Sequence, residues 1–137
     1  MRTMTKMSPL LPPPQVEGDL EEQWRVLLAR HATVSCALEK ALQNEHGIGV
    51  SEFETLDHLI RTAQCGDYRM SDLSVQSYLS QSALSRAVAR LERDGLVKRS
   101  HCSDDRRAIF VCATDQGREL HGRAQATHLA VLGQTLV

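Results

Sequence analysis

Apolar residues, with one histidine among them, recur at helical spacing over the first third of the chain. They are Leu20, Trp24, Leu27, Leu28, His31, Val34, Leu38, Ala41 and Leu42. This spacing predicts a long helix that opens with a capping box at Asp19 and Glu22 and runs to about Asn44. Gly47 and Gly49 are expected to end it.

Three further helices are predicted, over residues 51–61, 71–77 and 114–137. Each starts at a hydroxyl side chain, Ser51, Ser71 or Thr114, that can accept a hydrogen bond from a free backbone N–H of the first turn. Ser51 also has capping-box spacing to Glu54. Their inward faces are expected at Phe53, Leu56, Leu59 and Ile60 in the first helix and at Leu120, Ala124, Leu129 and Leu132 in the last. Residues 62–69 are expected to form a loop.

Residues 80–93 predict a helix with two different faces. Ser80 is a suitable N-cap, and Gly95 is a suitable residue to end the helix. The buried stripe is expected at Leu84, Ala87, Val88 and Leu91. The outward face of the first two turns then consists of Gln81, Ser82, Ala83, Ser85 and Arg86. Such a helix is slim enough to enter the major groove of DNA.

The outward side chains carry groups that suit DNA. Gln and Ser can hydrogen-bond base edges, Ala can contact a thymine methyl group, and Arg86 can pair with guanine or phosphate. Arg90 and Arg93 lie further along the helix and suit phosphates. The alternative is an ordinary amphipathic helix whose cationic face is only solvated.

The segment that follows favours DNA binding. Residues 96–101 and 108–112 are short and rich in β-forming residues, and a polar loop joins them, which predicts a hairpin. A hairpin directly after a helix-turn-helix is a wing. Its first strand carries Arg99, and its loop carries Arg106 and Arg107, the residue type that suits the narrow minor groove.

Five short segments carry a resemblance to a known family. They are residues 79–85, 91–92, 95–97, 105–107 and 113–117. Together they resemble the multiple-antibiotic-resistance regulator (MarR) family of bacterial winged-helix repressors, from about Leu20 to His128. The resemblance implies that Arg107 enters the minor groove, that Asp105 orients it, and that residues 81–86 read bases. Arg106 is an additional cation at the wing tip.

The predicted fold is mainly α with a small β-hairpin wing, a winged helix-turn-helix with N- and C-terminal dimerisation helices. The chain has 137 residues, which suits one domain, and its 42% hydrophobic but only 4% aromatic residues suit a core of Leu, Ala and Val. Residues 1–18 hold all four prolines and are expected to form a flexible arm. The MarR-like domain is expected over residues 19–137.

The first helix predicts a homodimer, because one small winged domain cannot easily cover both its broad apolar stripe and the last helix. Within the domain, residues 19–46 and 114–137 are the expected dimerisation helices, and residues 51–112 the DNA-binding core. The resemblance implies that these outer helices intertwine. A two-fold dimer can place two recognition helices about 10 base pairs apart on a pseudo-palindromic operator. The alternative is a monomer whose first helix is well covered.

The net charge of −1 argues against DNA at first sight, but the charges are unevenly distributed. Residues 80–107 hold seven basic and four acidic residues, which gives +3. Residues 17–58 hold three basic and nine acidic residues, which gives −6. We therefore expect the cationic end to face a duplex.

The resemblance also implies a small aromatic or phenolic effector bound between the dimer helices and the winged domain. By position, the candidate lining residues are Trp24, His31, Phe53 and His58. The alternative is that each of them is simply a core residue. An effector that prefers one arrangement of the dimer would shift the population and lower the affinity for the operator.

The cysteines and histidines predict no metal and no cofactor. The four cysteines, Cys36, Cys65, Cys102 and Cys112, contain no C-x-x-C pair. Cys36 and Cys112 are expected to be buried, and the other two to lie in loops. His121 and His128 share a helix face, and His31 or His46 can approach them in a dimer. A thiol- or metal-responsive sensor of the same fold stays open as an alternative.

The sequence does not predict an enzyme, because it contains no G-x-S-x-G, no phosphate-binding glycine loop and no H-E-x-x-H. No apolar run approaches the length of a membrane span, and no signal peptide is visible, so we expect a cytoplasmic protein. The sequence pattern thus predicts a double-stranded DNA-binding regulator, and the resemblance implies a repressor that an effector releases. The competing hypothesis is a winged-helix protein-interaction module without DNA binding.

Overall fold

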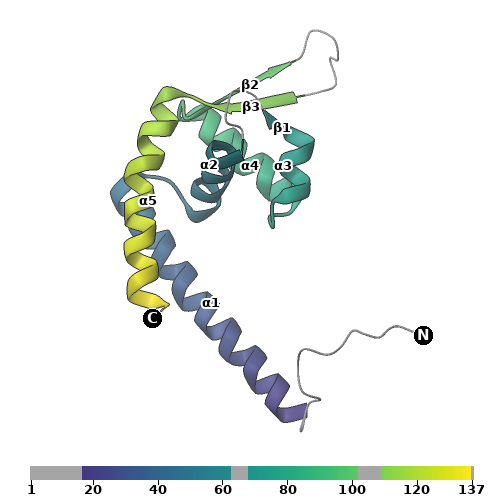
Figure 1. Ribbon diagram of the computed structural model, residues 1–137, viewed down its shortest axis with the longest axis vertical. Coiled ribbons are helices and arrows are strands. Elements are labelled where there is room, and N and C mark those ends of the chain that lie inside the picture. The colour runs from purple at the N-terminus through teal and green to yellow at the C-terminus, as the bar shows by residue number, and fades with distance from the viewer. Residues whose placement is uncertain (1–16, 63–67, 102–108, 137) are drawn as a thin grey trace, which may run out of the picture.

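The computed structural model describes residues 17–62, 68–101 and 109–136 and forms a mainly helical protein with a small β-sheet (Figure 1). The elements are α1 (Glu17–His46), α2 (Val50–Thr62), β1 (Tyr68–Arg69), α3 (Met70–Gln76), α4 (Gln81–Arg93), β2 (Val97–His101), β3 (Ile109–Ala113) and α5 (Asp115–Thr135). The helices α2, α3 and α4 with the sheet form a winged helix-turn-helix, which confirms the predicted fold class. Helices α1 and α5 pack together beside it.

The sheet is antiparallel with strand order β1-β3-β2. Strands β2 and β3 form the predicted hairpin, with Arg99 opposite Val111. Strand β1 falls within the segment expected to be a loop, and it pairs Arg69 with Phe110. Two residues are too few to show a strand period in the sequence, and their pairing partners lie far along the chain in β3.

The main hydrophobic core lies between α2, α4, the hairpin and α5. Its fully buried side chains include Leu42, Leu56, Leu59, Leu73, Leu84, Val88, Leu91, Leu96, Val97 and Val111. The stripe predicted for α4 is buried at all four positions, so its opposite face is left outward as expected. Burial of these aliphatic side chains removes apolar surface from water and fixes the position of α4 against α2.

The predicted ends of α4 and the start of α5 are confirmed. The Ser80 hydroxyl accepts a hydrogen bond from the Ala83 N–H at 3.2 Å, and Gly95 has φ +78°, a conformation that favours glycine. The Thr114 hydroxyl accepts from the Gly117 N–H at 3.0 Å and donates to the Gly95 carbonyl at 2.7 Å. One threonine therefore fixes the start of α5 to the end of α4.

The other predicted caps are wrong. Helix α1 begins at Glu17, so Asp19 lies inside it, and α2 begins at Val50, one residue before Ser51. The Glu52 carboxylate, rather than Ser51, accepts from the Gly49 N–H at the start of α2.

A carboxylate of α1 also caps the start of α2, because Glu39 Oε1 accepts a hydrogen bond from the Val50 N–H at 2.9 Å. Helix α3 begins at Met70 after Arg69, whose side chain makes no capping bond, so Ser71 is not its cap.

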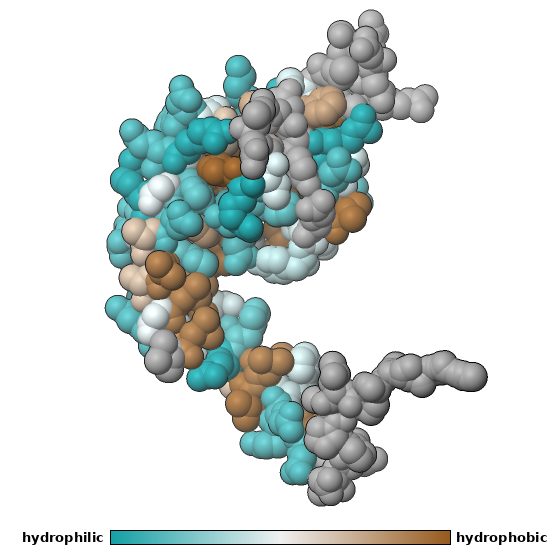
Figure 2. Space-filling model, in the orientation of Figure 1, coloured by the Kyte–Doolittle hydropathy of each residue, from teal (hydrophilic) through white to brown (hydrophobic). Residues whose placement is uncertain are grey.

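Helix α1 packs on α5 only along its C-terminal part, where Val34 and Leu38 form a small core with Val131. The N-terminal part extends away from the rest of the molecule (Figure 1) and leaves large apolar side chains exposed, among them Leu20, Trp24, Val26, Leu27 and Leu28. Figure 2 shows apolar side chains gathered there and on the C-terminal part of α5.

Two predictions of burial are wrong. Cys36 on α1 is exposed, and Leu129, expected on the inward face of α5, is 69% exposed. The other expected inward residues of α5, Leu120, Ala124 and Leu132, all pack against one of the two cores. Among the described residues, no helix combines the length and the hydropathy needed to cross a membrane.

Candidate nucleic-acid interface and effector groove

The predicted base-reading face of α4 is open to solvent. Gln81, Ser82, Ser85 and Arg86 are exposed, as is the capping residue Ser80, and Ala83 is half-buried. The buried Leu and Val residues hold the opposite side of the helix, so this face cannot turn inward. Within the described residues Arg86 forms no ion pair, which leaves its guanidinium available to an external acceptor.

Three arginines further along, Arg90 and Arg93 of α4 and Arg99 of β2, have internal partners. The Arg90 Nε pairs with Glu52, the buried carboxylate that caps α2. Arg93 pairs with Asp94 at 3.2 Å, and Arg99 of β2 pairs with Glu92 at 3.1 Å. These contacts show that Arg90 ties α4 to the start of α2; contact of Arg90 or Arg99 with phosphate stays a prediction.

The wing tip lies outside the described residues, and with it the predicted contacts Asp105, Arg106 and Arg107. The strands that lead into it are described, and they extend from the helical body (Figure 1). Sequence reasoning missed Arg69 of β1, whose guanidinium lies 5.7 Å from the centre of the Phe110 ring. Only the sheet pairing, which the sequence does not show, brings these two residues together.

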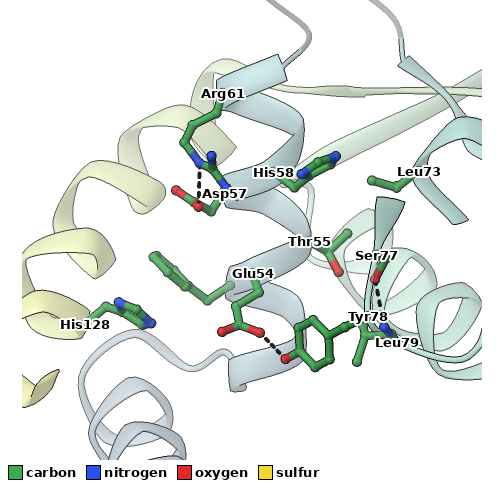
Figure 3. Close-up of a pocket in the computed structure, with 11 residues that line it drawn as sticks. Glu54, Thr55, Asp57, His58, Arg61, Leu73, Ser77, Tyr78, Leu79 and His128 are labelled. Atoms are coloured by element: carbon green, nitrogen blue, oxygen red, sulfur yellow. Dashed lines mark hydrogen bonds and ion pairs between the residues drawn. The ribbon is translucent and has the colours of Figure 1, made fainter. Parts of the chain in front are cut away.

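A groove of about 310 Å³ runs along α2. Its walls come from α2, from α3 and the turn after it, and from α5 (Figure 3). The lining residues are Phe53, Glu54, Thr55, Asp57, His58, Arg61, Leu73, Ser77, Tyr78, Leu79 and His128. A cavity of this size is at the lower end of the range for small-molecule sites.

The groove brings together only two of the four predicted effector residues. Phe53 and His58 line it, as expected. Trp24 and His31 do not, because they lie on the exposed part of α1, where the His31 ring is hydrogen-bonded to the Ser35 hydroxyl at 3.4 Å. All four were proposed from their position in the chain, which could not show that this part of α1 has no neighbour among the described residues.

The carboxylate of Asp57 is held between two donors at one side of the groove. Arg61 Nε lies 2.9 Å from its Oδ2 atom, and His121 Nε2 of α5 lies 2.7 Å from its Oδ1 atom. Burial alone would raise the pKa of Asp57, but the hydrogen bonds from His121 and Arg61 outweigh it and lower the pKa below its ordinary value. Asp57 is therefore ionised at neutral pH and joins α2 to α5.

Tyr78 connects the groove to the helix-turn-helix. Its hydroxyl donates a hydrogen bond to Glu54 of α2 (Figure 3). Burial and this hydrogen bond to an anion raise the pKa of Tyr78, so it remains a neutral donor. Tyr78 lies two residues before Ser80, the cap of α4, and a ligand in the groove would thus touch the segment that positions the base-reading helix.

Two histidines of α5, His121 and His128, share a helix face as expected, and both rings are stacked with the ring of Phe53. The His121 ring is stacked at 5.6 Å and the His128 ring at 4.6 Å, measured between ring centres. His46 approaches α5 within the same chain, through a 2.7 Å hydrogen bond to Thr127. In the described part of the chain, no group of three or more His, Cys, Asp or Glu side chains is placed to hold a metal ion.

Comparison with known proteins points to one family. Residues 51–109 match the MarR family. The chain is 35% identical over 54 residues to the homoprotocatechuate degradative operon repressor of Escherichia coli, a match that covers 39% of this chain and 36% of that protein. The matched segment thus spans only about a third of that relative's length.

Two solved structures from Streptomyces coelicolor extend the likeness to most of the fold. The MarR family transcriptional regulator AbsC has 29% sequence identity and a TM-score of 0.77, over 90% of this chain and 82% of AbsC. The MarR family regulator Sco3205, solved in complex with DNA, has 28% identity and a TM-score of 0.78, over 90% of this chain and 77% of Sco3205. Residues 51–109 therefore match the MarR family, and the chain has the fold of MarR-family transcriptional regulators.

Proposed function

We propose that this protein is a transcriptional repressor that binds double-stranded DNA as a homodimer and is released by a small-molecule effector. The observation that carries the proposal is the outward face of α4, which presents Gln81, Ser82, Ser85 and Arg86 to solvent beside a hairpin wing. A small, polar helix face with a cation that is unpaired within the described residues fits base edges and phosphates in the major groove.

The arrangement of helix and wing supports two contacts per subunit. Helix α4 would enter a major groove, and the wing would reach the adjacent minor groove with Arg107, oriented by Asp105 as the family resemblance implies. Arg106 would add a cation at the tip. This role is one of binding rather than catalysis, and it places the protein where the chromosome is, in the cytoplasm.

The exposed stripe of α1 supports the homodimer. Leu20, Trp24 and Leu27 continue the same helix face that Val34 and Leu38 bury against α5 further along. The stripe thus extends beyond the part of α1 that α5 covers, and Leu129 of α5 and Leu136 directly after that helix are also exposed. A second copy related by a two-fold axis can cover both surfaces at once, and exposed apolar area of this kind marks an interface.

The groove along α2 supports effector control. It lies between α5, which packs on the proposed dimerisation helix α1, and the turn that precedes α4. A ligand bound there would contact both the dimer scaffold and the DNA-reading unit. It would lower the affinity for DNA to the extent that it prefers one placement of the two recognition helices over another.

Selection of bound duplexes from random and genomic DNA tests the function. We expect enrichment of a pseudo-palindrome whose half-sites are about 10 base pairs apart, centre to centre. Binding of the selected duplex, followed by fluorescence anisotropy, should weaken steeply between low and moderate salt because neutralised phosphates release counterions. A chain that enriches no sequence and binds no duplex in dilute buffer would instead be a protein-interaction module.

A further inference from the structure

The charged groups that line the groove leave one carboxylate without a cation. Arg61 is paired with Asp57, whose second oxygen faces His121. Among the described residues, Glu54 receives the hydrogen bond of the neutral Tyr78 hydroxyl and forms no ion pair. The uncompensated charge on the wall of the groove is therefore negative.

The rest of the wall is aromatic or apolar. His128, whose ring is stacked with that of Phe53, lies on one side, and Tyr78, Leu73 and Leu79 lie on the other, with Glu54 between them (Figure 3). A volume of about 310 Å³ accommodates a ligand built on one ring. An aromatic wall around a carboxylate is also a setting that attracts cations, because the faces of aromatic rings are negative.

Two buried polar atoms of the wall have no hydrogen-bond partner among the described residues. They are the hydroxyl of Thr55, a residue only 4% exposed, and Nε2 of His128. Buried polar atoms normally have partners, so each of these is a place where a bound molecule can complete the bonding. They lie on either side of Glu54 in Figure 3, so one ligand with N–H donors can address the carboxylate and at least one of them.

We propose that the groove selects a planar aromatic ligand that carries a positive charge, such as an amidine or a protonated amine, over a carboxylate of the same shape. The cation would face Glu54 and the ring would lie against Phe53, His128 and Tyr78. The Glu54 carboxylate would repel an anionic ligand. Such a ligand could pair with Arg61 only if the ion pair between Arg61 and Asp57 were broken. The inference rests on the proposed effector function and names the class of its ligand.

Benzamidine, benzamide and benzoate test the charge preference because they share one shape and carry charges of +1, 0 and −1. Titration of the full-length protein, followed by calorimetry and by NMR shifts of the groove residues, should rank them in that order. We expect benzamidine to bind at least about tenfold more tightly than benzoate, because the Glu54 carboxylate attracts the positive charge of benzamidine and repels the negative charge of benzoate. Benzoate binding as tightly as benzamidine, or no binding of any of the three, would overturn the proposal.

A matched pair of variants assigns the preference to one residue. Glu54→Gln keeps an acceptor for Tyr78 and removes the charge, so benzamidine should lose most of its advantage while benzamide is unaffected. Glu119→Gln removes a carboxylate from the exposed surface of α5 and should change nothing. If Glu54→Gln keeps the parent preference, the proposal is wrong.

Two readouts keep this test decisive. If Glu54→Gln does not fold, nuclear Overhauser effects in the parent protein locate the binding site. Benzamidine bound in the groove should show contacts between its protons and the rings of Phe53 and His128, and the absence of such contacts would refute the proposed site. Binding of the selected operator is measured on the same sample without ligand. Benzamidine selectivity without operator binding would refute the repressor function alone, and operator binding without ligand selectivity would refute this inference alone.

Discussion

Glu52 joins the start of α2 to α4 through one side chain. It is 7% exposed, and it accepts from the Gly49 N–H and from Arg90. Glu52→Ala should lower the free energy of unfolding by about 2–4 kcal/mol, because it leaves a buried donor and a half-buried guanidinium unpaired. Glu52→Gln, which keeps an acceptor for Gly49, should cost less. Urea unfolding measures both, and an alanine variant as stable as the parent would contradict this role.

Arg86 differs from Arg90 in having no internal ion pair among the described residues, although the two lie one turn apart on α4. Arg86→Ala should therefore weaken operator binding by about 1–3 kcal/mol. If Arg86 contacts a phosphate, the slope of the logarithm of the binding constant against the logarithm of the salt concentration should also become less steep by about one. Arg123→Ala, which removes an exposed cation from α5, is the matched control. Equal anisotropy titrations for parent and Arg86→Ala would exclude α4 as the reading helix.

Asp57 makes stability depend on pH in a definite direction. Its folded pKa lies below the ordinary 3.8, so its contribution is fully present above about pH 4 and is lost as the pH falls through the folded pKa. Asp57→Asn should be less stable than the parent at pH 7, by roughly 1–3 kcal/mol for hydrogen bonds to a charged group. Thermal unfolding from pH 7 to pH 2 should show this difference shrinking; a constant difference would exclude the carboxylate charge as its cause.

Among the elements, the junction between α4 and α5 is fixed by close backbone packing. A Cβ atom at Gly117 would lie 2.1 Å from the Leu96 carbonyl oxygen, so the first turn of α5 can approach the residue before β2 only with glycine there. Gly117→Ala should destabilise the protein by about 2 kcal/mol or more, because backbone must move.

Gly122 provides the control, since it lies in the same helix and a Cβ atom added there would meet nothing within 4 Å. Gly122→Ala should leave the fold intact and stabilise it by up to about 1 kcal/mol through helix propensity. Chemical denaturation of the two variants side by side checks the pair. Equal effects would mean that the two helices do not meet as described.

The sequence predicted those elements whose signals are local. Leu84, Val88 and Leu91 lie at helical spacing, and Ser80 and Gly95 bracket them, so α4 was placed to the residue. The cap of α2 was missed because both Ser51 and Glu52 can supply an oxygen to a free N–H. Tertiary contacts with Arg90 settle the choice of Glu52, and sequence spacing does not contain them.

The groove was only half predictable for the same reason. Phe53 and His58 both lie on α2, a helix that the sequence predicts, so both could be proposed from their position in the chain. Tyr78, Arg61 and His128 come together only after α3, α4 and α5 are packed, so no local pattern indicated them. Trp24 and His31 were placed in it wrongly, because periodicity shows that a face is apolar but not which surface covers it.

At the scale of the whole molecule, the DNA-reading unit and the extended part of α1 differ in charge. The outward face of α4 and the wing carry the cationic groups, while the extended part of α1 is acidic apart from its apolar stripe. Phosphate would repel this acidic surface, so the protein is oriented before it touches DNA. The same asymmetry keeps the proposed dimer interface away from the duplex.

Dimerisation should therefore be separable from the fold of the winged domain. Leu27 lies on the apolar stripe of α1 and is 58% exposed, whereas Val26, 56% exposed, points about a quarter turn or more away from it. Leu27→Glu should yield a folded monomer in sedimentation experiments, since a buried unpaired charge at an interface is costly. Val26→Glu should leave the dimer intact.

The consequence for DNA follows from symmetry. A monomer retains one α4 and one wing, so Leu27→Glu should bind a duplex with a single half-site as well as the parent subunit does. The parent dimer binds the full pseudo-palindrome more tightly than a single half-site, because once one subunit is bound the second contact is intramolecular. The Leu27→Glu monomer should lose most of this gain in affinity. A Leu27→Glu protein that is monomeric yet binds the full operator like the parent would show that the two recognition helices do not act as a pair.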